Sequence, residues 1–253
     1  MPSANRLSAL EKALNVLEAV GDQLQPVGLP DLAARLGLPR QTVHRVLGQL
    51  VSLRLVIRDQ PRERYSVGPR LSKLAFGTLR SLNQSAPVRQ ILQDLVEDIG
   101  ETCNIGLLHD FDYVYLQRIE CAWPLRLHQD VGTRVPAHTV SGGKLLLANL
   151  EPSLSRRLIR ARKPKAATSF TLTSLSQLEA EFARIRAAGY ALNNQERLEG
   201  VVGAAVPVVD ATGNVLAAVG MHGPLPRLTL KICERHVPRM HQAAVRIARE
   251  WSA

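Results

Sequence analysis

Apolar residues in the first 50 positions recur at helical spacing in three short segments. The first segment predicts a helix over 8–20, because its apolar positions recur every three or four residues. Pro30 suits the first turn of a second helix, and Gly37 suits the left-handed position that ends it. Pro39, two residues farther on, suits the first turn of a third helix. The buried face of this third helix is expected to hold Val43, Val46, Leu47 and Leu50.

A polar row lies opposite the apolar face of the third helix. It comprises Arg40, Gln41, His44, Arg45 and Gln49. These side chains are long enough to reach base edges and phosphates. Two helices joined by a tight turn form a helix-turn-helix, whose second helix fits a major groove of DNA. Short helical hairpins also occur in all-α cores, so the pattern by itself leaves both DNA binding and a purely structural hairpin open.

Two short β-prone runs follow the third helix, at 55–57 and 65–67, and a polar loop with a proline occupies 58–64 between them. They predict a hairpin that acts as the wing of a winged helix-turn-helix. Arginines on its loop would hold backbone phosphates or enter a minor groove. The expected DNA contacts of the third helix and the wing are Arg40, Gln41, Thr42, His44, Arg45, Arg58, Arg62 and Arg64.

A helical period over 69–84 predicts a connector between two domains. The expected organisation is therefore a mainly α-helical winged helix-turn-helix domain over 1–70, a linker helix over 71–85, and a second domain over 86–253 that binds an effector and forms oligomers.

The second domain mixes amphipathic helices with short apolar strands. The expected helices are 88–99, 144–150, 151–160, 174–188 and 229–251, and the expected strands are 102–108, 113–119, 125–129, 203–209 and 215–221. Gly and Asn within 210–214 predict a hairpin between the last two strands. Strands paired by hairpins, with helices on one side, predict an α+β sensor domain of the GAF/PAS kind around a mainly antiparallel sheet that can enclose a small ligand.

Positive charge is concentrated around the predicted third helix and wing. The chain has 32 Lys and Arg against 22 Asp and Glu, a formal net charge of +10. Residues 35–70 hold eight arginines and two acidic residues, and arginine forks onto phosphate oxygens and guanine edges. A polyanion is therefore the expected partner, although a basic face that is only solvated has the same composition.

Catalytic and metal-binding motifs are absent from the sequence. It has no Gly-x-Ser-x-Gly, no metal-binding spacing among its seven histidines and no Cys-x-x-Cys among its three cysteines. The glycine pair before Lys144 lacks the other residues of a phosphate-binding loop. No catalytic residue, metal or cofactor is therefore expected. Free N–H groups at the glycine-rich helix entry, 140–144, can receive a carboxylate, or the glycines can form only a tight turn.

The sequence predicts neither a membrane span nor secretion. Its apolar runs are far shorter than the roughly 20 residues of a membrane-spanning helix. The N-terminal residues lack the basic start and apolar stretch of a secretion signal, so the expected location is the cytoplasm.

Several separated motifs resemble, in order, those of the isocitrate lyase regulator (IclR) family of bacterial transcription factors. In the first domain they are ALEKALNVL at 9–17, LGLPRQTVHRVL at 36–47 and YSVG at 65–68. In the second domain they are VGTRVPAHTVSGGKLLLA at 131–148, AGY at 188–190, NNQERLEG at 193–200, AAVP at 204–207, and GP at 223–224 with Arg227. The resemblance covers nearly the whole chain.

The resemblance implies a regulator, with repression as the expected mode, that binds a palindromic operator as a homodimer or homotetramer. It also implies a second domain that senses a small organic acid. The family's effector contacts, carried over by position, fall on Ser141, Gly142, Gly143, Asn193, Gly203, Gly220 and His222.

Some relatives have aspartate, cysteine and two serines where this chain has Asn193, Gly203, Gly220 and His222. These differences should enlarge the pocket and remove hydrogen bonds to a very small ligand. The expected effector is therefore a larger carboxylate, with aromatic acids among the candidates. His222 is a candidate partner for that carboxylate, with a structural role as the alternative.

The expected mechanism is a population shift. Binding of the ligand changes how two domains or two protomers are arranged. This change decides whether both recognition helices reach half-sites about one helical turn apart. Two other classes stay open. A nucleic-acid packaging protein would suit the charge but would have no use for a ligand-sized second domain. An enzyme with a DNA-binding appendage would need a catalytic constellation within 86–253, and none is visible.

Overall fold

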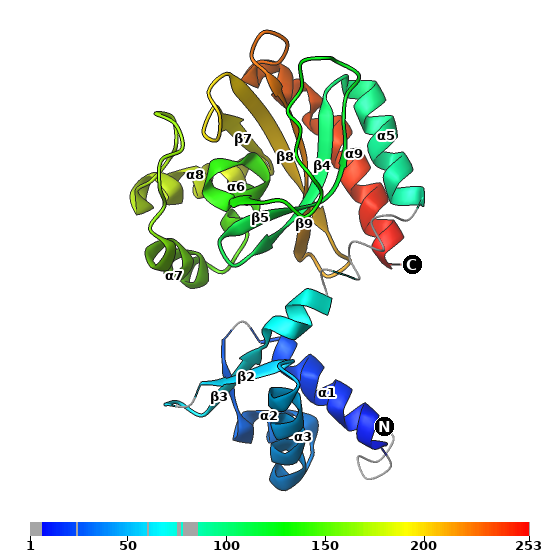
Figure 1. Cartoon of the computed structure of the whole chain (residues 1–253), viewed down its shortest axis with the longest axis vertical. Helices are drawn as coiled ribbons and strands as arrows, with labels where there is room; N and C mark the ends of the chain where they lie inside the picture. Colours follow the sequence, from blue (N-terminus) through cyan, green and yellow to red (C-terminus); the bar gives the residue numbers. More distant parts are fainter. Residues whose placement is uncertain (1–6, 24, 60, 75–76, 78–85, 253) are drawn as a thin grey trace. The chain divides into compact units, whose positions relative to one another are not determined.

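The computed structural model describes residues 7–23, 25–59, 61–74, 77 and 86–252, and the chain forms two compact units that divide between residues 79 and 80 (Figure 1). Each unit has its own hydrophobic core. The elements of the first unit are α1 (Ala9–Gly21), β1 (Val27–Gly28), α2 (Leu29–Leu36), α3 (Arg40–Ser52), β2 (Val56–Asp59) and β3 (Arg64–Val67).

The three predicted helices of the first unit are confirmed, and their ends follow the local chemistry. A capping box starts α1: the Glu11 N–H donates to Ser8 Oγ at 3.2 Å, and the Ser8 N–H donates to the Glu11 carboxylate at 2.7 Å. Gly37 ends α2 in the left-handed conformation with φ 62°. Pro39 is the residue before α3 rather than its first helical residue. The four predicted apolar residues of α3 are all buried.

The predicted hairpin is confirmed, with longer strands than expected and a third strand beside it. Strand β2 pairs antiparallel with β3, and the two-residue β1 pairs with the other edge of β3. Arg58 and Arg64 lie in β2 and β3, so their placement on a loop over 58–64 was wrong. Strand β1 was not expected, because two residues are too few for an alternating pattern to show.

After the wing, residues 69–74 and residue 77 are helical. The remainder of the linker helix predicted over 71–85 lies outside the described residues.

The second unit is built on six antiparallel strands in the order β6-β5-β4-β9-β8-β7. The strands are β4 (Thr102–His109), β5 (Asp112–Ile119), β6 (Arg134–Pro136), β7 (Ala191–Asn194), β8 (Val201–Val209) and β9 (Val215–Pro224). The helices are α5 (Ala86–Ile99), the 3-10 helix η2 (Ala137–Thr139), α6 (Ser141–Ala148), α7 (Pro152–Arg162), α8 (Leu175–Ala188) and α9 (Leu230–Ser252).

Helices cover both faces of this sheet, which corrects the expectation of helices on one side. Figure 1 shows α5 and α9 on one face and α6, α7 and α8 on the other. Five consecutive residues of β8, from Val202 to Val206, are buried. Successive side chains of a strand point to opposite faces, so a run of this kind requires cover on both.

The prediction of a strand over 125–129 was wrong. The free edge of β5 is occupied by the chain at 132–136: Tyr115 exchanges backbone hydrogen bonds with Gly132 and Thr133, and β6 continues the pairing. The segment 125–129 therefore does not pair with β5, and Leu125 is 67% exposed. Strands β6 and β7 were missed because each is short and contains Pro or Asn, which are uncommon in strands.

None of the described helices combines the length and apolar character that crossing a bilayer requires.

Candidate functional site

The exposed face of α3 presents a row of polar side chains to solvent. Arg40, Gln41, His44 and Arg45 are exposed, whereas Thr42 is half-buried. The four exposed side chains have no hydrogen-bond or ion-pair partner within the described part of the chain. Because the opposite face of α3 is packed into the core of the first unit, the row is held on a fixed support. The arrangement can bind a groove of duplex DNA.

The three wing arginines differ in their partners. Arg58 forms an ion pair with Glu63, and Arg64 donates to the carbonyl of Pro26 at 3.0 Å. Arg62 lies in the turn between β2 and β3, is exposed, and has no partner among the described residues. Arg62 is therefore the wing arginine whose donors are all available to a phosphate, as judged from the described residues.

A pocket opens in the second unit between the start of α6, the middle of the sheet and the turn after β7. The cavity itself has a volume of about 40 Å³, whereas the empty space is about 480 Å³ when the open mouth is included. The pocket is therefore a narrow slot. Its walls are formed by Asn104, Tyr113, Tyr115, Leu127, Gln129, Val140, Ser141, Gly142, Asn193, Arg197, Leu198, Val201, Gly220, Met221 and His222.

Five of the seven residues expected at the effector site meet in this pocket, namely Ser141, Gly142, Asn193, Gly220 and His222. Gly143 and Gly203 do not line it. A Cβ on Gly143 would overlap the Ala137 carbonyl oxygen, and one on Gly203 would overlap the Met221 carbonyl oxygen. These two glycines permit close backbone packing. Gly203 therefore does not enlarge the pocket, contrary to the expectation from the sequence.

The first residues of α6, Ser141 and Gly142, line the pocket, and their backbone N–H groups have no acceptor in the described part of the chain. Val140 precedes the helix and offers no side-chain acceptor to the first N–H groups, those of Ser141 and Gly142 among them. Tyr113 packs over Gly142, where a Cβ would lie 2.6 Å from the ring. A helix N-terminus with free N–H groups favours an anion.

Polar side chains complete the walls. Asn193 Nδ2 donates to the Thr139 carbonyl at 2.7 Å, which leaves its Oδ1 free to accept. Gln129 Oε1 is buried and has no hydrogen-bond partner in the described part of the chain. Arg197 has no acidic partner among the described residues. The pocket therefore offers an unpaired cation, free N–H groups and unsatisfied acceptors to one ligand.

His222 contributes no positive charge to this pocket. Its Nε2 lies 3.1 Å from Nη1 of the buried Arg118, and because a guanidinium only donates, Nε2 must accept. Burial, reinforced by the charge of Arg118, lowers the pKa of His222 to about 3. A ligand carboxylate would therefore meet a neutral ring that can donate from Nδ1, and Arg197 is the cation in the wall.

Sequence reasoning missed Arg118, Arg197 and Gln129. Arg118 carried a usable signal, since a charged residue in an apolar strand needs a specific partner. Arg197 lies within a segment that was already singled out, but no spacing distinguishes it from its neighbours. Gln129 was assigned to a strand that the structure does not contain.

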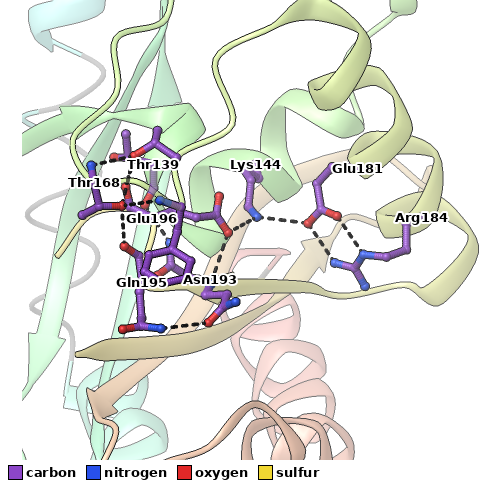
Figure 2. A network of polar contacts seen from close by, with 11 residues as sticks. Thr139, Lys144, Thr168, Glu181, Arg184, Asn193, Gln195 and Glu196 are labelled. Carbon is purple, nitrogen blue, oxygen red and sulfur yellow. Dashed lines mark hydrogen bonds and ion pairs between the residues drawn. The ribbon is translucent and has the colours of Figure 1, made fainter. Parts of the chain in front are cut away.

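A buried ion-pair network joins two walls of the pocket (Figure 2). Lys144 Nζ, on α6, binds Glu196 at 2.6 Å and Glu181 at 3.0 Å, and Arg184 binds Glu181 on the far side. Glu196 immediately precedes Arg197 in the chain. The network therefore ties the helix that supplies the N–H groups to the turn that supplies the cation.

The two carboxylates of this network respond differently to burial. Burial raises the pKa of Glu196, and the charge of Lys144 only partly opposes it. Burial also acts upward on Glu181, but the hydrogen bond from Arg184 and the charge of Lys144 outweigh it, so the pKa of Glu181 is lowered. Lys144 points into this network, which agrees with the conclusion that its glycine-rich motif is not a nucleotide loop.

Both units match known protein families. The model of the IclR helix-turn-helix domain matches residues 9–60, and the model of the bacterial transcriptional regulator IclR C-terminal domain matches residues 76–249. Among curated proteins, the chain is 38% identical over 237 residues to the probable transcriptional regulator SauR of Cupriavidus necator, covering 94% of each protein. It is 28% identical to the transcriptional repressor IclR of Escherichia coli, covering 90% of this chain and 84% of the repressor.

Solved structures share the architecture. The IclR protein of Thermotoga maritima superposes with a TM-score of 0.60 at 24% identity, covering 95% of this chain and 97% of that protein. The C-terminal domain of Escherichia coli KdgR superposes with a TM-score of 0.59 at 27% identity, covering 67% of this chain and 97% of that domain. The exposed polar face of α3 and the pocket of the second unit agree with these matches, which establish that the chain belongs to the IclR family of bacterial transcriptional regulators, DNA-binding proteins with an effector domain.

Proposed function

We propose that this regulator reads its operator through Arg40, Gln41, His44 and Arg45 of α3, and represses transcription when bound. The observation that carries the proposal is the row of exposed side chains without internal partners, among the described residues, on a helix packed from behind. Arg and Gln are the residues that pair bidentately with guanine and adenine. Thr42, half-buried beside them, can reach a phosphate at the rim of the groove.

The wing supports α3 by contacting the DNA backbone. Arg62 makes this contact directly, whereas Arg58 and Arg64 contribute with the donors left over from their contacts to Glu63 and the Pro26 carbonyl. A homodimer or homotetramer presents two such surfaces to half-sites of a palindromic operator, about one helical turn apart. Because bacterial DNA lies in the cytoplasm, the regulator acts there.

The effector we propose is a small carboxylate, held by the N–H groups at the start of α6 and by Arg197. Gln129 and Asn193 would form hydrogen bonds with the other polar groups of the ligand. The rings of Tyr113 and Tyr115 suit an aromatic acid. A solved relative, an IclR homologue from Microbacterium hydrocarbonoxydans, is complexed with 4-hydroxybenzoate. Because the slot is narrow, a ligand that displaces one of its walls on entry would give the bound and free states different structures, as a population shift requires.

The first experiment is a gel shift of the purified chain on the DNA upstream of its own gene, at physiological salt with excess non-specific competitor. A discrete shift that survives the competitor supports sequence-specific operator binding. Loss of the shift to competitor, together with failure to select any preferred site from random duplexes, would overturn it.

The effector assignment is tested by thermal shift with a panel of organic acids. We expect the responding acid to stabilise the wild-type chain and to have little effect on Arg197→Gln, because binding to the folded state is what raises stability. Arg235→Gln, an exposed α9 residue with the same charge change, is the matched control and should respond like wild type. An equal response of Arg197→Gln would remove this residue from the site.

A further inference from the structure

A second basic surface lies on the second unit, remote in sequence from the helix-turn-helix. It consists of α7 and the three residues after it, and we call it the α7 ridge: Arg156, Arg157, Arg160, Arg162, Lys163 and Lys165. These six cations fall within ten residues that contain no Asp or Glu. The rest of 86–253 has 14 basic and 16 acidic residues, so the ridge accounts for the whole positive excess of this unit.

The ridge is exposed and held in place. All six residues are exposed. Arg156 pairs with Glu179 on α8, and Arg162 lies 3.5 Å from Asp110. The ring of His138 donates to the Lys165 carbonyl at 3.0 Å, which anchors the chain after the helix. The cations therefore project from a fixed backbone.

Three of the cations have no acidic partner in the described part of the chain, namely Arg160, Lys163 and Lys165. Arg160 and Arg162 lie in the last turn of α7, where positive charge complements the helix dipole. The dipole extends over one turn only, so it does not account for Lys165, which has no acidic partner among the described residues. The cations of the α7 ridge that lack an acidic partner are therefore available to an anion from outside the chain, or they stay solvated.

The chemistry of the ridge favours a phosphate backbone over a membrane or a protein. No large apolar side chain is exposed within 152–165, whereas membrane-binding helices insert apolar residues and protein interfaces have an apolar core. Four of the six cations are arginines, which fork onto phosphate oxygens.

We propose that the α7 ridge is a second DNA-binding surface, which contacts backbone phosphates of duplex DNA beyond the stretch that α3 and the wing cover. It adds affinity without sequence preference, because phosphate contacts carry none. The inference goes beyond operator reading by α3 and does not depend on which bases α3 recognises.

The test compares a ridge variant with a charge-matched control in the full chain. The ridge variant is Arg160→Gln with Lys163→Gln and Lys165→Gln, and the control is Lys231→Gln with Arg235→Gln and Arg249→Gln on α9. All six positions are exposed, so both variants should fold, which circular dichroism and thermal unfolding verify. Fluorescence anisotropy measures binding at several salt concentrations to duplexes of about 20 and about 60 base pairs, where the shorter just spans two half-sites one turn apart.

We expect the slope of log affinity against log salt for the ridge variant to be smaller than wild type by about two to three on the long duplex. At physiological salt the long duplex should bind about tenfold or more weakly, since each lost phosphate contact removes released counterions. Binding to the short duplex should not change. The control should match wild type on both.

Equal slopes for the ridge variant and wild type on the long duplex would overturn the proposal, and so would an equal loss in the control. The long duplex is used with both operator and scrambled sequence. A wild-type chain that does not discriminate between them refutes operator reading by α3, whereas the ridge is still judged from the salt slopes. The two claims therefore fail separately.

Discussion

Two sets of polar residues in this protein have opposite surroundings. On α3, Arg40 and Arg45 project into solvent without a partner in the described part of the chain. In the second unit, Lys144 is just as charged but fully buried, and two carboxylates satisfy it. The contrast separates groups that are available to a partner from groups that hold a site together. Arg197 belongs to the first kind although it lies in the second unit, because its charge has no acidic partner among the described residues.

The largest effect is expected from removing the buried cation. Lys144→Met leaves the buried Glu196 without a counter-charge and beside Glu181, which keeps only Arg184, and this should destabilise the second unit by about 3–5 kcal/mol. Urea unfolding of the full chain measures this. Arg184→Gln is the control, since Arg184 is 41% exposed on its side chain and its loss should cost less than about 1 kcal/mol. Equal stability of the two variants would show that the buried network is not what holds the pocket walls.

On the exposed side, Arg45→Ala should weaken operator binding by about 1–3 kcal/mol and relax sequence preference at the base it contacts. Arg62→Ala should instead weaken operator and scrambled duplex alike and reduce the salt slope by about one. Anisotropy titrations on matched duplexes distinguish the two patterns. A uniform loss for Arg45→Ala would assign it to the backbone.

The pH dependence of stability probes His222, whose ring is half-buried beside Arg118 in the folded chain and is fully exposed to water when the chain unfolds. Its folded pKa of about 3 lies below its ordinary value near 6.5, so the unfolded state binds the proton more tightly between these values. The contribution of His222 to the free energy of unfolding is fully present above pH 6.5 and is lost as the pH falls toward 3. Between pH 7 and pH 5 the loss is about 2 kcal/mol.

Urea unfolding at the two pH values tests this for wild type and His222→Asn. The variant should lack the His222 contribution, while the opposing effect of Glu196, whose pKa is raised, stays in both proteins and cancels in the comparison. The same pH dependence in both would mean that His222 is accessible to protons in the folded state.

The last comparison is between two helical glycines, and it includes the smallest expected effect, that of Gly48→Ala. Gly48 on α3 is exposed, and a methyl group added there would meet nothing within 4 Å, so Gly48→Ala should stabilise the first unit by about 0.5–1 kcal/mol. Gly143→Ala places its methyl against the Ala137 carbonyl and should destabilise the second unit by about 1–3 kcal/mol. Thermal unfolding of each variant measures the direction of both changes in stability. A Gly143→Ala variant that is more stable than wild type would contradict the close packing.

Much of the fold follows from local sequence patterns, and the predictions that failed have identifiable causes. The helices of the first unit and the 201–224 hairpin were predictable because periodicity and turn residues act over a few positions. Strands β6 and β7 were not, since each is short and contains Pro or Asn in place of the β-prone residues that marked β2 and β3. The strand expected at 125–129 failed because a different segment pairs with the edge of β5, and a sequence does not show which edges are free.

For the candidate site, the motifs located α3, the wing and the start of α6, because these depend on neighbours in the chain. They did not show that Gly143 and Gly203 face away from the pocket, that His222 is neutral beside Arg118, or that Lys144 is bound by Glu181 and Glu196. The last two properties arise from residues 37 to 104 positions apart in the chain. Burial and charge at such a contact depend on how the layers pack, and local periodicity carries no information about that.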